Sequence, residues 1–496
     1  MLTSRLWLAV AAAAFLAWLA LPGTFVFDDH SVFVDPAVVA GDAWRQWVRL
    51  EQTRPLTYIT FWADYRLWGA AAGGFHFTNL LIHLACGAFL FLCGRRLFEK
   101  NVAWTAALVF LLHPLAQEPL LYVFARSSSL AALFCLAALW FWLRDRPGAA
   151  VLLFGVSLLA KEEWVAFPAA LALIDRARRE RQRWPYLGAM AGLAAAAGAR
   201  VIYATKAVAG SGSGFGQSDS PWQYFLREGQ AVPGYLWRTL LPIRMPLDAP
   251  APWADLEAGI VGWAGLVLLA GAAAWFCEKK EVAGFWLLPA FAVLLPSSSF
   301  LPAADPVAWR RMYLPMAFLA LGAALWLRPR PRAVWAVLLT LAVLAGLRRP
   351  IWQDEAALWR ESQAAAPLQL RPYLQLSRLT ARDEALRYLE QAKKIAPNDP
   401  EVASESGRVW LESGNAARAL PEFGRALALA PGEARYVVNR GAVLLALGQR
   451  DAARADFERA LRLSPCLLPA RQNLERMGIP PPPPPTPCPT INSAAK

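Results

Sequence analysis

The 496-residue chain has few charged residues: Asp, Glu, Lys and Arg together make up 18% of it. Average soluble domains contain about 25% charged residues. Hydrophobic residues reach 57%, and the mean hydropathy is +0.32. This balance excludes disorder, collagen and a small disulfide-rich module for most of the chain, and it argues against an ordinary soluble enzyme.

The sequence also lacks the motifs of nucleotide and zinc chemistry. It contains no Walker loop, dinucleotide fingerprint or zinc-protease helix, so a nucleotide-driven enzyme is disfavoured. The six cysteines have no metal-ligand spacing, and four of them lie in or beside apolar segments, where they act as small hydrophobic side chains. Cys466 and Cys488 could pair in an oxidising compartment, but the spacing favours this only weakly.

The chain does contain a series of apolar segments. Eleven of them predict membrane-spanning helices, and the 23 Trp residues are typical of membrane interfaces. The first segment has no clear cleavage site and is expected to be a retained helix. The segments are 6–21, 76–97, 102–113, 127–143, 148–160, 164–175, 184–204, 259–276, 282–297, 312–327 and 333–347.

Basic residues predict the orientation of this membrane domain, residues 1–350. With the N-terminus in the cytoplasm, Lys and Arg cluster in the even-numbered connections, as the positive-inside rule expects. The basic excess therefore does not indicate a nucleic-acid partner. Residues 222–243, which contain Glu228 and Pro233, are expected to lie at the interface or to re-enter without crossing. Everything after residue 348 then faces the outside.

The last third of the chain repeats with a period of 34 residues. Pro397, Pro431 and Pro465 keep this spacing, as do small and aromatic positions in each unit. Such a pattern is typical of tetratricopeptide (TPR) repeats, in which proline ends the second helix. We predict a linker at 351–366, TPR repeats at 367–478 and a disordered Pro-rich tail at 479–496. The expected fold class is all-α, a polytopic membrane helical bundle followed by a C-terminal TPR superhelix.

Four polar clusters lie on the predicted outer side. The first is Asp28-Asp29, directly after the first span. Two adjacent carboxylates at a membrane surface are costly unless they are solvated, paired or metal-bound. A carboxylate whose pKa is raised there can act as a general base. The alternative is a solvated loop start.

Each of the other three clusters contains Lys or Arg, and two of them also contain Glu. Adjacent arginines on the outer side suggest an anionic ligand, because guanidinium groups bind phosphate through two hydrogen bonds. The alternatives are polar turns, snorkelling side chains and plain headgroup contact. Together the clusters favour glycosyl transfer from a polyprenyl-phosphate sugar, with the lipid phosphate as leaving group. The members of these three clusters are His113, Glu118 and Arg126; Lys161 and Glu162; and Arg310, Arg311 and Tyr313.

In this order the motifs resemble those of the transmembrane and TPR-repeat-containing O-mannosyltransferases, a branch of the class C (GT-C) integral-membrane glycosyltransferases. The resemblance runs from about residue 24 to 470. It includes Asp28-Asp29, Arg54-Pro55-Leu56-Thr57, the Phe-His pair and Asn of 75–83, His113-Pro114-Leu115 with Glu118, Arg126-Ser127, Lys161-Glu162, Arg310 to Pro315, and Trp352 to Trp359.

The resemblance implies an inverting mannosyltransferase that acts on a protein Ser/Thr or other hydroxyl. Asp28 or Asp29 would be the catalytic carboxylate, or would bind a divalent metal such as Mn²⁺ or Mg²⁺. Glu118 would shape the site, supported by His113 and Glu162. The phosphate would be held by Arg126, Lys161, Arg310, Arg311 and Tyr313. The chain departs from the pattern at Trp309, where the family has Glu.

On this interpretation the partners are a polyprenyl-phosphate sugar donor, membrane lipid and a protein or peptide acceptor bound by the TPR repeats. The composition favours a bacterial inner membrane with site and repeats facing the periplasm; in a eukaryote they would face the lumen of the endoplasmic reticulum. Two other functions stay open. One is a non-catalytic membrane-anchored TPR scaffold for envelope protein assembly. The other is a transporter, which the lack of an internal repeat among the spans disfavours.

Overall fold

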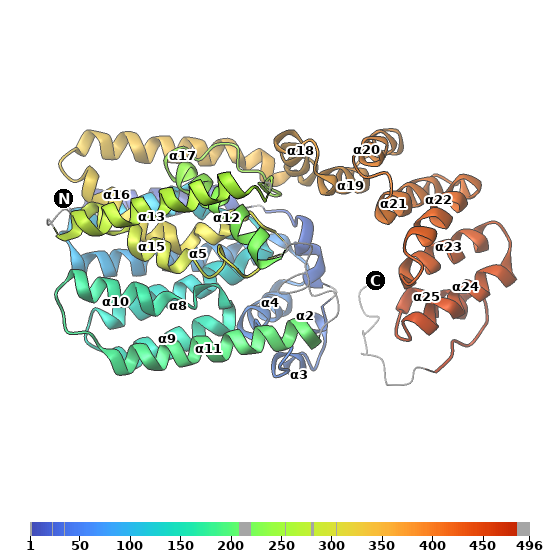
Figure 1. Cartoon of the computed structure of the whole chain (residues 1–496), viewed down its shortest axis with the longest axis horizontal. Helices are drawn as coiled ribbons and strands as arrows, with labels where there is room; N and C mark the ends of the chain where they lie inside the picture. Colours follow the sequence, from blue (N-terminus) through green and yellow to red (C-terminus); the bar gives the residue numbers. More distant parts are fainter. Residues whose placement is uncertain are drawn as a thin grey trace. The chain divides into compact units, whose positions relative to one another are not determined.

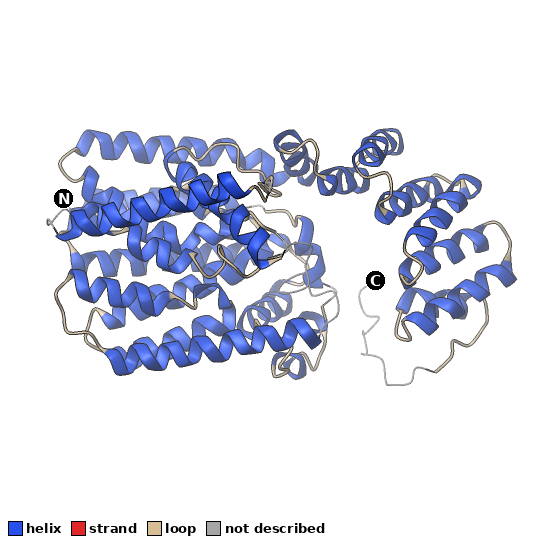
Figure 2. Cartoon of the chain, viewed as in Figure 1, coloured by secondary structure: helices blue, strands red, loops and turns tan. Residues whose placement is uncertain are grey.

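The computed structural model describes residues 2–21, 23–33, 35–207, 220–252, 254–278, 282–303 and 305–483. Within these ranges the regular structure is helical, without a β-strand (Figure 1, Figure 2), so the all-α expectation is confirmed there. The chain divides into two compact units. Unit 1 comprises Met1–Met245 and Ala251–Asp354, and unit 2 comprises Pro246–Pro250 and Glu355–Lys496.

Unit 1 is a bundle of long helices joined by short ones. Figure 1 shows α8, α9, α11, α13 and α17 running alongside one another, with α2, α3 and α4 gathered at one end. The longer helices are α1 Leu2–Ala20, α4 Pro55–Trp68, α5 Ala72–Leu97, α6 Lys100–Leu112, α8 Arg126–Trp142, α9 Pro147–Ala160, α10 Phe167–Ala177, α11 Trp184–Ala207, α12 Pro221–Leu240, α13 Leu256–Glu278, α15 Leu287–Leu294, α16 Tyr313–Leu327 and α17 Pro331–Gln353.

Short helical turns connect these helices and carry several of the polar candidate residues. Asp28 and Asp29 lie on η1, Glu118 begins α7, and Arg310 lies on η5. The short elements are η1 Phe27–Phe33, α2 Pro36–Val39, α3 Trp44–Trp47, η2 Pro114–Ala116, α7 Glu118–Leu121, η3 Val123–Ala125, η4 Glu162–Trp164, α14 Val282–Phe285 and η5 Trp309–Met312.

Several helices of unit 1 could cross a membrane. Five described helices are long and apolar enough, and three shorter apolar helices cover 9–20, 100–112 and 147–160. Each of the eleven predicted segments coincides with helix, although 282–297 is divided between α14 and α15. Unit 1 is therefore consistent with a multi-pass membrane protein, and the number of eleven spans stays a prediction. The five are Ala72–Leu97, Val123–Trp142, Trp184–Thr205, Leu256–Trp275 and Pro331–Gln353.

Local sequence signals explain where polar connections give way to helix. Pro55, Pro147 and Pro331 each occupy the first helical position, where a missing N–H costs no hydrogen bond. Helix α12 begins with a capping box: the Gln223 N–H donates to Ser220 Oγ at 3.2 Å, and the Ser220 N–H donates to Gln223 Oε1 at 2.9 Å. Residues 222–243 thus lie mostly in one capped helix that is not among the five candidate spans.

Unit 2 consists of antiparallel helix pairs with a 34-residue period. The repeated alanines and aromatic residues of the pattern, such as Ala426, Phe423 and Phe457, are buried between the helices. Residues 355–365, which the sequence assigns to a linker, form helix α18, and tail residues 484–496 lie outside the described residues. The helices are α18 Glu355–Ala365, α19 Leu370–Leu379, α20 Arg382–Ile395, α21 Pro400–Glu412, α22 Ala416–Leu429, α23 Ala434–Ala446, α24 Arg450–Leu463 and α25 Leu468–Arg476.

Candidate functional site

The two adjacent aspartates on η1 have different surroundings. Asp29 is fully buried, and its two carboxylate oxygens accept the backbone N–H groups of Phe124, at 2.7 Å, and Val26, at 3.1 Å. Burial raises the pKa of Asp29 to about 8, even though these N–H groups favour the charged form. Asp28 is partly exposed, and its Oδ2 accepts a hydrogen bond from the Tyr122 hydroxyl at 3.0 Å. Asp28 is therefore the member of the pair that a substrate can reach.

A second carboxylate, Glu118, begins α7 one helical turn before Tyr122. The Tyr122 N–H donates to the Glu118 carbonyl at 2.8 Å, and Glu118 Oε1 lies 3.3 Å from Arg310 Nη1. The other oxygen, Oε2, is buried and has no hydrogen-bond partner among the described residues. Burial raises the pKa of Glu118, and the Arg310 guanidinium opposes this rise. An unpaired buried oxygen is costly, so Glu118 Oε2 is suited to accept a substrate hydroxyl.

Arg310 on η5 is held by two carboxylates and stays partly exposed. Its Nη2 lies 2.9 Å from Asp305 Oδ2, in addition to the contact with Glu118. Burial lowers the pKa of Arg310, but the charges of Glu118 and Asp305 outweigh this and raise it. Its side chain keeps 23% of its surface accessible, so part of the guanidinium can contact a ligand.

Lys161, between α9 and η4, is near Arg310. Its Nζ donates to Ser128 Oγ at 2.7 Å and forms an ion pair with Glu163 Oε2 at 2.7 Å. Burial lowers the pKa of Lys161; Glu163 opposes this, whereas the positive charge of nearby Arg310 adds to it. The positive charges of Lys161 and Arg310 thus both act on Glu118, where each favours the charged carboxylate.

Glu162 is engaged by an arginine from a distant part of the chain. Arg54 Nη2 donates to Glu162 Oε1 at 2.8 Å, and Arg54 Nε donates to the other oxygen at 3.4 Å. Burial alone would raise the pKa of Glu162, but the facing Arg54 lowers it to about 2. Glu162 therefore joins the start of α4 to the turn that carries Lys161.

Arg126 is completely buried and surrounded by partners. Its side chain contacts Asp64 Oδ2 at 2.6 Å and Asn79 Oδ1 at 2.6 Å, and its guanidinium carbon lies 4.7 Å from the centre of the Phe61 ring. It also donates to Thr60 Oγ1 and to the Phe75 carbonyl. These contacts join α8 to α4 and α5, so the structure gives Arg126 the surroundings of a packing residue and not those of a phosphate ligand.

Tyr313 and His113 also lie in packed surroundings. The Tyr313 hydroxyl is buried 2.7 Å from His83 Nδ1 on α5. His113 Nδ1 accepts the Leu115 N–H at 3.2 Å, and its Nε2 lies 3.0 Å from the Thr239 carbonyl. Both side chains fix neighbouring helices. Arg311 is likewise 6% exposed and paired with Glu228.

Trp309, at the position where the resembling pattern has Glu, packs against α12. It is buried, its ring meets Tyr235 edge to face at 5.7 Å, and the Arg238 guanidinium carbon lies 4.7 Å from its ring centre. The Trp309 indole therefore interacts with a cation.

The described residues do not build a metal site by themselves. They contain no group of three or more His, Cys, Asp or Glu that could hold an ion. Both Asp29 oxygens already accept backbone N–H groups, which leaves Asp28 as the carboxylate of the pair that can reach an ion. Mg²⁺ is often held by one or two carboxylates together with substrate phosphate and water. A metal at Asp28 would thus need further oxygen ligands from a bound phosphate group and water.

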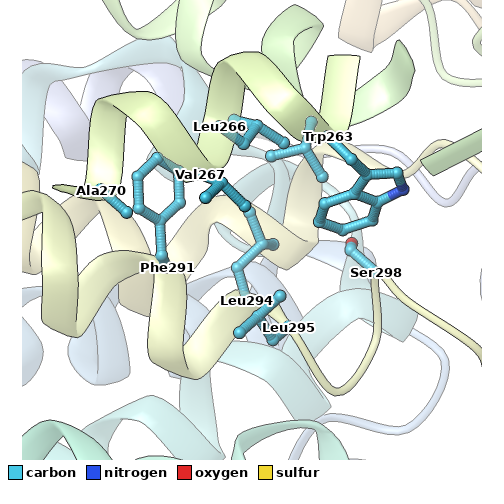
Figure 3. Close-up of a pocket in the computed structure, with 9 residues that line it drawn as sticks. Trp263, Leu266, Val267, Ala270, Phe291, Leu294, Leu295 and Ser298 are labelled. Atoms are coloured by element: carbon cyan, nitrogen blue, oxygen red, sulfur yellow. The ribbon is translucent and has the colours of Figure 1, made fainter. Parts of the chain in front are cut away.

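An apolar cavity of about 140 Å³ lies between α12, α13 and α15. Figure 3 shows Trp263, Leu266 and Val267 of α13 facing Phe291 and Leu294 of α15. Its remaining lining residues are Val232, Ala270, Leu295 and Ser298. Ser298 begins the connection that leads to Arg310.

Three residues that contact or adjoin Glu118, Arg310 and Arg311 cannot be singled out from the sequence. Tyr122 and Asp305 lie in the same connections as Glu118 and Arg310. This closeness in sequence is the local feature that could have pointed to them as site residues. In the sequence, Glu228 stands out only as a charged residue that makes 222–243 a poor membrane span. Its pairing with Arg311, 83 residues away, had no local signal.

The comparisons with known proteins agree with the resemblance seen in the sequence. Residues 434–465 match the tetratricopeptide repeat family. The chain is 29% identical to protein O-mannosyl-transferase F38B6.6 of Caenorhabditis elegans over 180 residues, 32% of this chain and 26% of that protein. It is 24% identical to human protein O-mannosyl-transferase TMTC4 over 472 residues, 74% of this chain and 63% of that protein. The chain thus spans less than two thirds of these relatives.

Two solved structures are similar to parts of the chain. The oligosaccharyltransferase of Archaeoglobus fulgidus is 13% identical with a TM-score of 0.35, over 79% of this chain and 60% of that one. A thermophilic TPR protein of Thermus thermophilus is 23% identical with a TM-score of 0.24, over 32% of this chain and 88% of that one. Scores this low do not show a common fold for the whole chain, so the GT-C-like architecture stays a prediction.

Proposed function

We propose that this protein transfers a sugar, mannose in the first instance, from a polyprenyl-phosphate donor to a hydroxyl of a protein Ser or Thr. The observation that carries the proposal is the group of Asp28, Glu118 and Arg310 around Tyr122, with Lys161 close enough to feel the charge of Arg310. It combines a reachable carboxylate with two cations. The names of the relatives, protein O-mannosyl-transferases, support mannose and a protein acceptor.

In the proposed reaction Asp28 is the general base. It takes the proton from the acceptor hydroxyl while the hydroxyl oxygen forms a bond to the anomeric carbon of the sugar. The bond from that carbon to the phosphate oxygen breaks, and polyprenyl phosphate leaves with the electron pair. Attack opposite to the leaving group inverts the anomeric centre. Arg310 and Lys161 stabilise the charge that develops on the phosphate, and Glu118 Oε2 accepts a sugar hydroxyl.

The other candidate residues support this geometry. Asp29 orients Asp28 by binding the backbone at Val26 and Phe124, which ties η1 to η3. Arg126 and Tyr313 hold the helices that carry the site. The apolar cavity between α12, α13 and α15 suits part of an isoprenoid chain, because its lining is nearly free of polar atoms. A divalent ion at Asp28 remains part of the proposal and is tested by adding a chelator.

The TPR unit would recognise the protein acceptor, as stacked helix pairs commonly do. We propose that both this unit and the site face an extracytoplasmic compartment. In support, the positive-inside rule keeps the basic connections in the cytoplasm and so places the loop with Asp28 outside. The pairing of Cys466 with Cys488 stays a prediction, because Cys488 lies outside the described residues. Cys86, Cys93 and Cys135 are free and buried, as expected.

The decisive test is sugar transfer by the purified full chain in vesicles. Radiolabelled polyprenyl-phosphate mannose and envelope protein extract are supplied with Mg²⁺ or Mn²⁺. We expect Asp28→Asn to lower transfer at least about 100-fold, because a general base contributes roughly 10² to 10⁴ to the rate. Asp42→Asn is the matched control, because Asp42 lies in the same loop, is exposed and forms an ion pair with Arg45 at 3.6 Å.

The alternative is a membrane-anchored TPR scaffold without catalysis. It predicts no transfer from mannose or other lipid-linked sugars by a folded wild-type chain that still binds partner proteins. If the label appeared only in lipid, the protein would still be a sugar transferase, but its acceptor would be a lipid and not a protein. Equal activity of wild type and Asp28→Asn would remove Asp28 from the mechanism.

A further inference from the structure

Arg311 is anchored by a buried carboxylate from a helix far away in the sequence. Its Nη1 donates to Glu228 Oε1 of α12 at 3.0 Å; Glu228 is completely buried, and the Arg311 side chain keeps 6% of its surface accessible. Arg311 also donates to the carbonyls of Pro306, at 2.8 Å, and Asp305, at 2.6 Å. A buried ion pair of this kind is strongly disrupted when one partner is removed, because the other charge remains.

Helix α12 holds the same connection at two more points. The Ala308 N–H donates to the Tyr235 hydroxyl at 2.9 Å, and the Tyr224 hydroxyl donates to the Ser297 carbonyl at 2.9 Å. Tyr224, Glu228 and Tyr235 are separated by four and seven residues, so they lie on one face of the helix. This face therefore fastens the connection both where it leaves α15 and where it enters η5.

The anchored connection is directly linked to Arg310. The Asp305 backbone carbonyl accepts a hydrogen bond from Arg311. The Asp305 carboxylate accepts one from Arg310, with 2.9 Å between Asp305 Oδ2 and Arg310 Nη2. Arg310 in turn meets Glu118 at 3.3 Å. If Arg311 loses Glu228, the backbone at Asp305 loses its fixed position, and the Asp305 carboxylate no longer orients the Arg310 guanidinium.

We propose that Glu228 is a positioning residue: through Arg311 and Asp305 it fixes Arg310 against the donor phosphate. This inference rests on the proposed transferase function. It also changes the role of Arg311, which the sequence grouped with Arg310 as a phosphate ligand. Of the two arginines only Arg310 would contact phosphate, whereas Arg311 and Glu228 hold the segment that carries it. Preorganised cations bind and stabilise a phosphate better because less reorganisation is needed.

The test compares Glu228→Gln with wild type in two measurements on the full chain. The first is hydrogen–deuterium exchange of residues 305–312, which reports the anchoring without requiring activity. The second is transfer kinetics at varied donor concentration. We expect faster exchange in 305–312 and a donor KM raised about 10-fold or more, as losing an oriented charge-assisted contact implies. We expect kcat to fall as well, because Arg310 also stabilises the charge that develops on the leaving phosphate.

Two further variants keep the test decisive. Glu228→Asp retains the charge and should recover part of the donor KM, and Tyr235→Phe removes the acceptor for the Ala308 N–H and should raise KM in the same direction. Glu99→Gln is the control, because Glu99 lies in an exposed ion pair with Arg328 at 3.6 Å. If Glu228→Gln does not fold, these two variants carry the measurement.

The outcomes separate this inference from the proposed function. Unchanged exchange in 305–312 overturns the anchoring, whether or not the protein transfers sugar. Faster exchange with an unchanged kcat/KM for the donor means that the anchoring does not serve donor binding or transfer, and it overturns the positioning role. A wild-type chain without transfer removes the proposed function and with it the role of Glu228 in donor binding.

Discussion

Neighbouring residues in this chain differ in function because they differ in access. Asp28 is partly exposed and meets a tyrosine hydroxyl, whereas Asp29 is buried and binds two backbone N–H groups. The same contrast separates Arg310, which keeps an accessible edge, from Arg311, which lies against Glu228. In both pairs the first residue keeps accessible surface, and the second fixes the backbone that carries the first.

The raised pKa of Asp29 predicts a pH dependence of stability. The native carboxyl holds its proton up to a pKa of about 8, compared with 3.8 for an ordinary aspartate. Between these values the native state binds more protons than the unfolded state, so the free energy of unfolding falls as the pH rises from about 4 to about 8. The apparent thermal midpoint of the full chain, followed by tryptophan fluorescence, should decrease over this range.

Asp29→Asn should remove this contribution to the slope. The amide cannot accept both N–H groups, so the variant should also be less stable at acidic pH by about 1–3 kcal/mol, the cost of an unsatisfied buried donor. Asp42→Asn should retain the wild-type slope. An Asp29→Asn chain with an unchanged slope would show that other groups cause the pH dependence.

At the scale of elements, close packing explains the glycines of the TPR period. A Cβ on Gly407 of α21 would lie 2.9 Å from the Phe423 ring of α22, and one on Gly441 would lie 2.8 Å from Phe457. The glycine of one helix and the aromatic residue of the next thus form one contact that recurs every 34 residues. This contact sets how closely the two helices of a repeat approach.

Gly407→Ala should therefore loosen its repeat. The added methyl group forces the helices apart at a cost of about 1–3 kcal/mol. Hydrogen exchange in residues 400–429 of the full chain should become faster. Gly424→Ala is the matched control, because Gly424 also lies in a helix but has open space where the Cβ would be, so alanine should leave exchange equal or slower. Identical behaviour of both variants would contradict the packing explanation.

At the scale of the whole molecule, the charge pattern predicts the orientation of unit 1. The basic connection after α10, with Arg178, Arg179 and Arg181, should face the cytoplasm, and the loop with Asp28 should face outside. Arg181→Cys and Asp42→Cys each add one thiol at an exposed position in these two connections. The native Cys86, Cys93 and Cys135 are buried and should react little.

We expect a membrane-impermeant maleimide to label Asp42→Cys in intact cells and Arg181→Cys only after the membrane is opened. Wild type, treated in parallel, gives the background. The reverse pattern would place the site in the cytoplasm and would contradict the use of an extracytoplasmic lipid-linked donor.

The apolar segments and the 34-residue period could be recognised in the sequence, and both correspond to helices in the described residues. Apolar length and the 34-residue spacing are local properties, so they could be read without knowing which helices meet. The tertiary structure decided which candidates can reach a ligand. Arg126 meets Asp64 and Arg311 meets Glu228 only because distant helices pack together. Nothing local distinguishes these buried arginines from Arg310, since access and pairing arise from contacts between segments far apart in the chain.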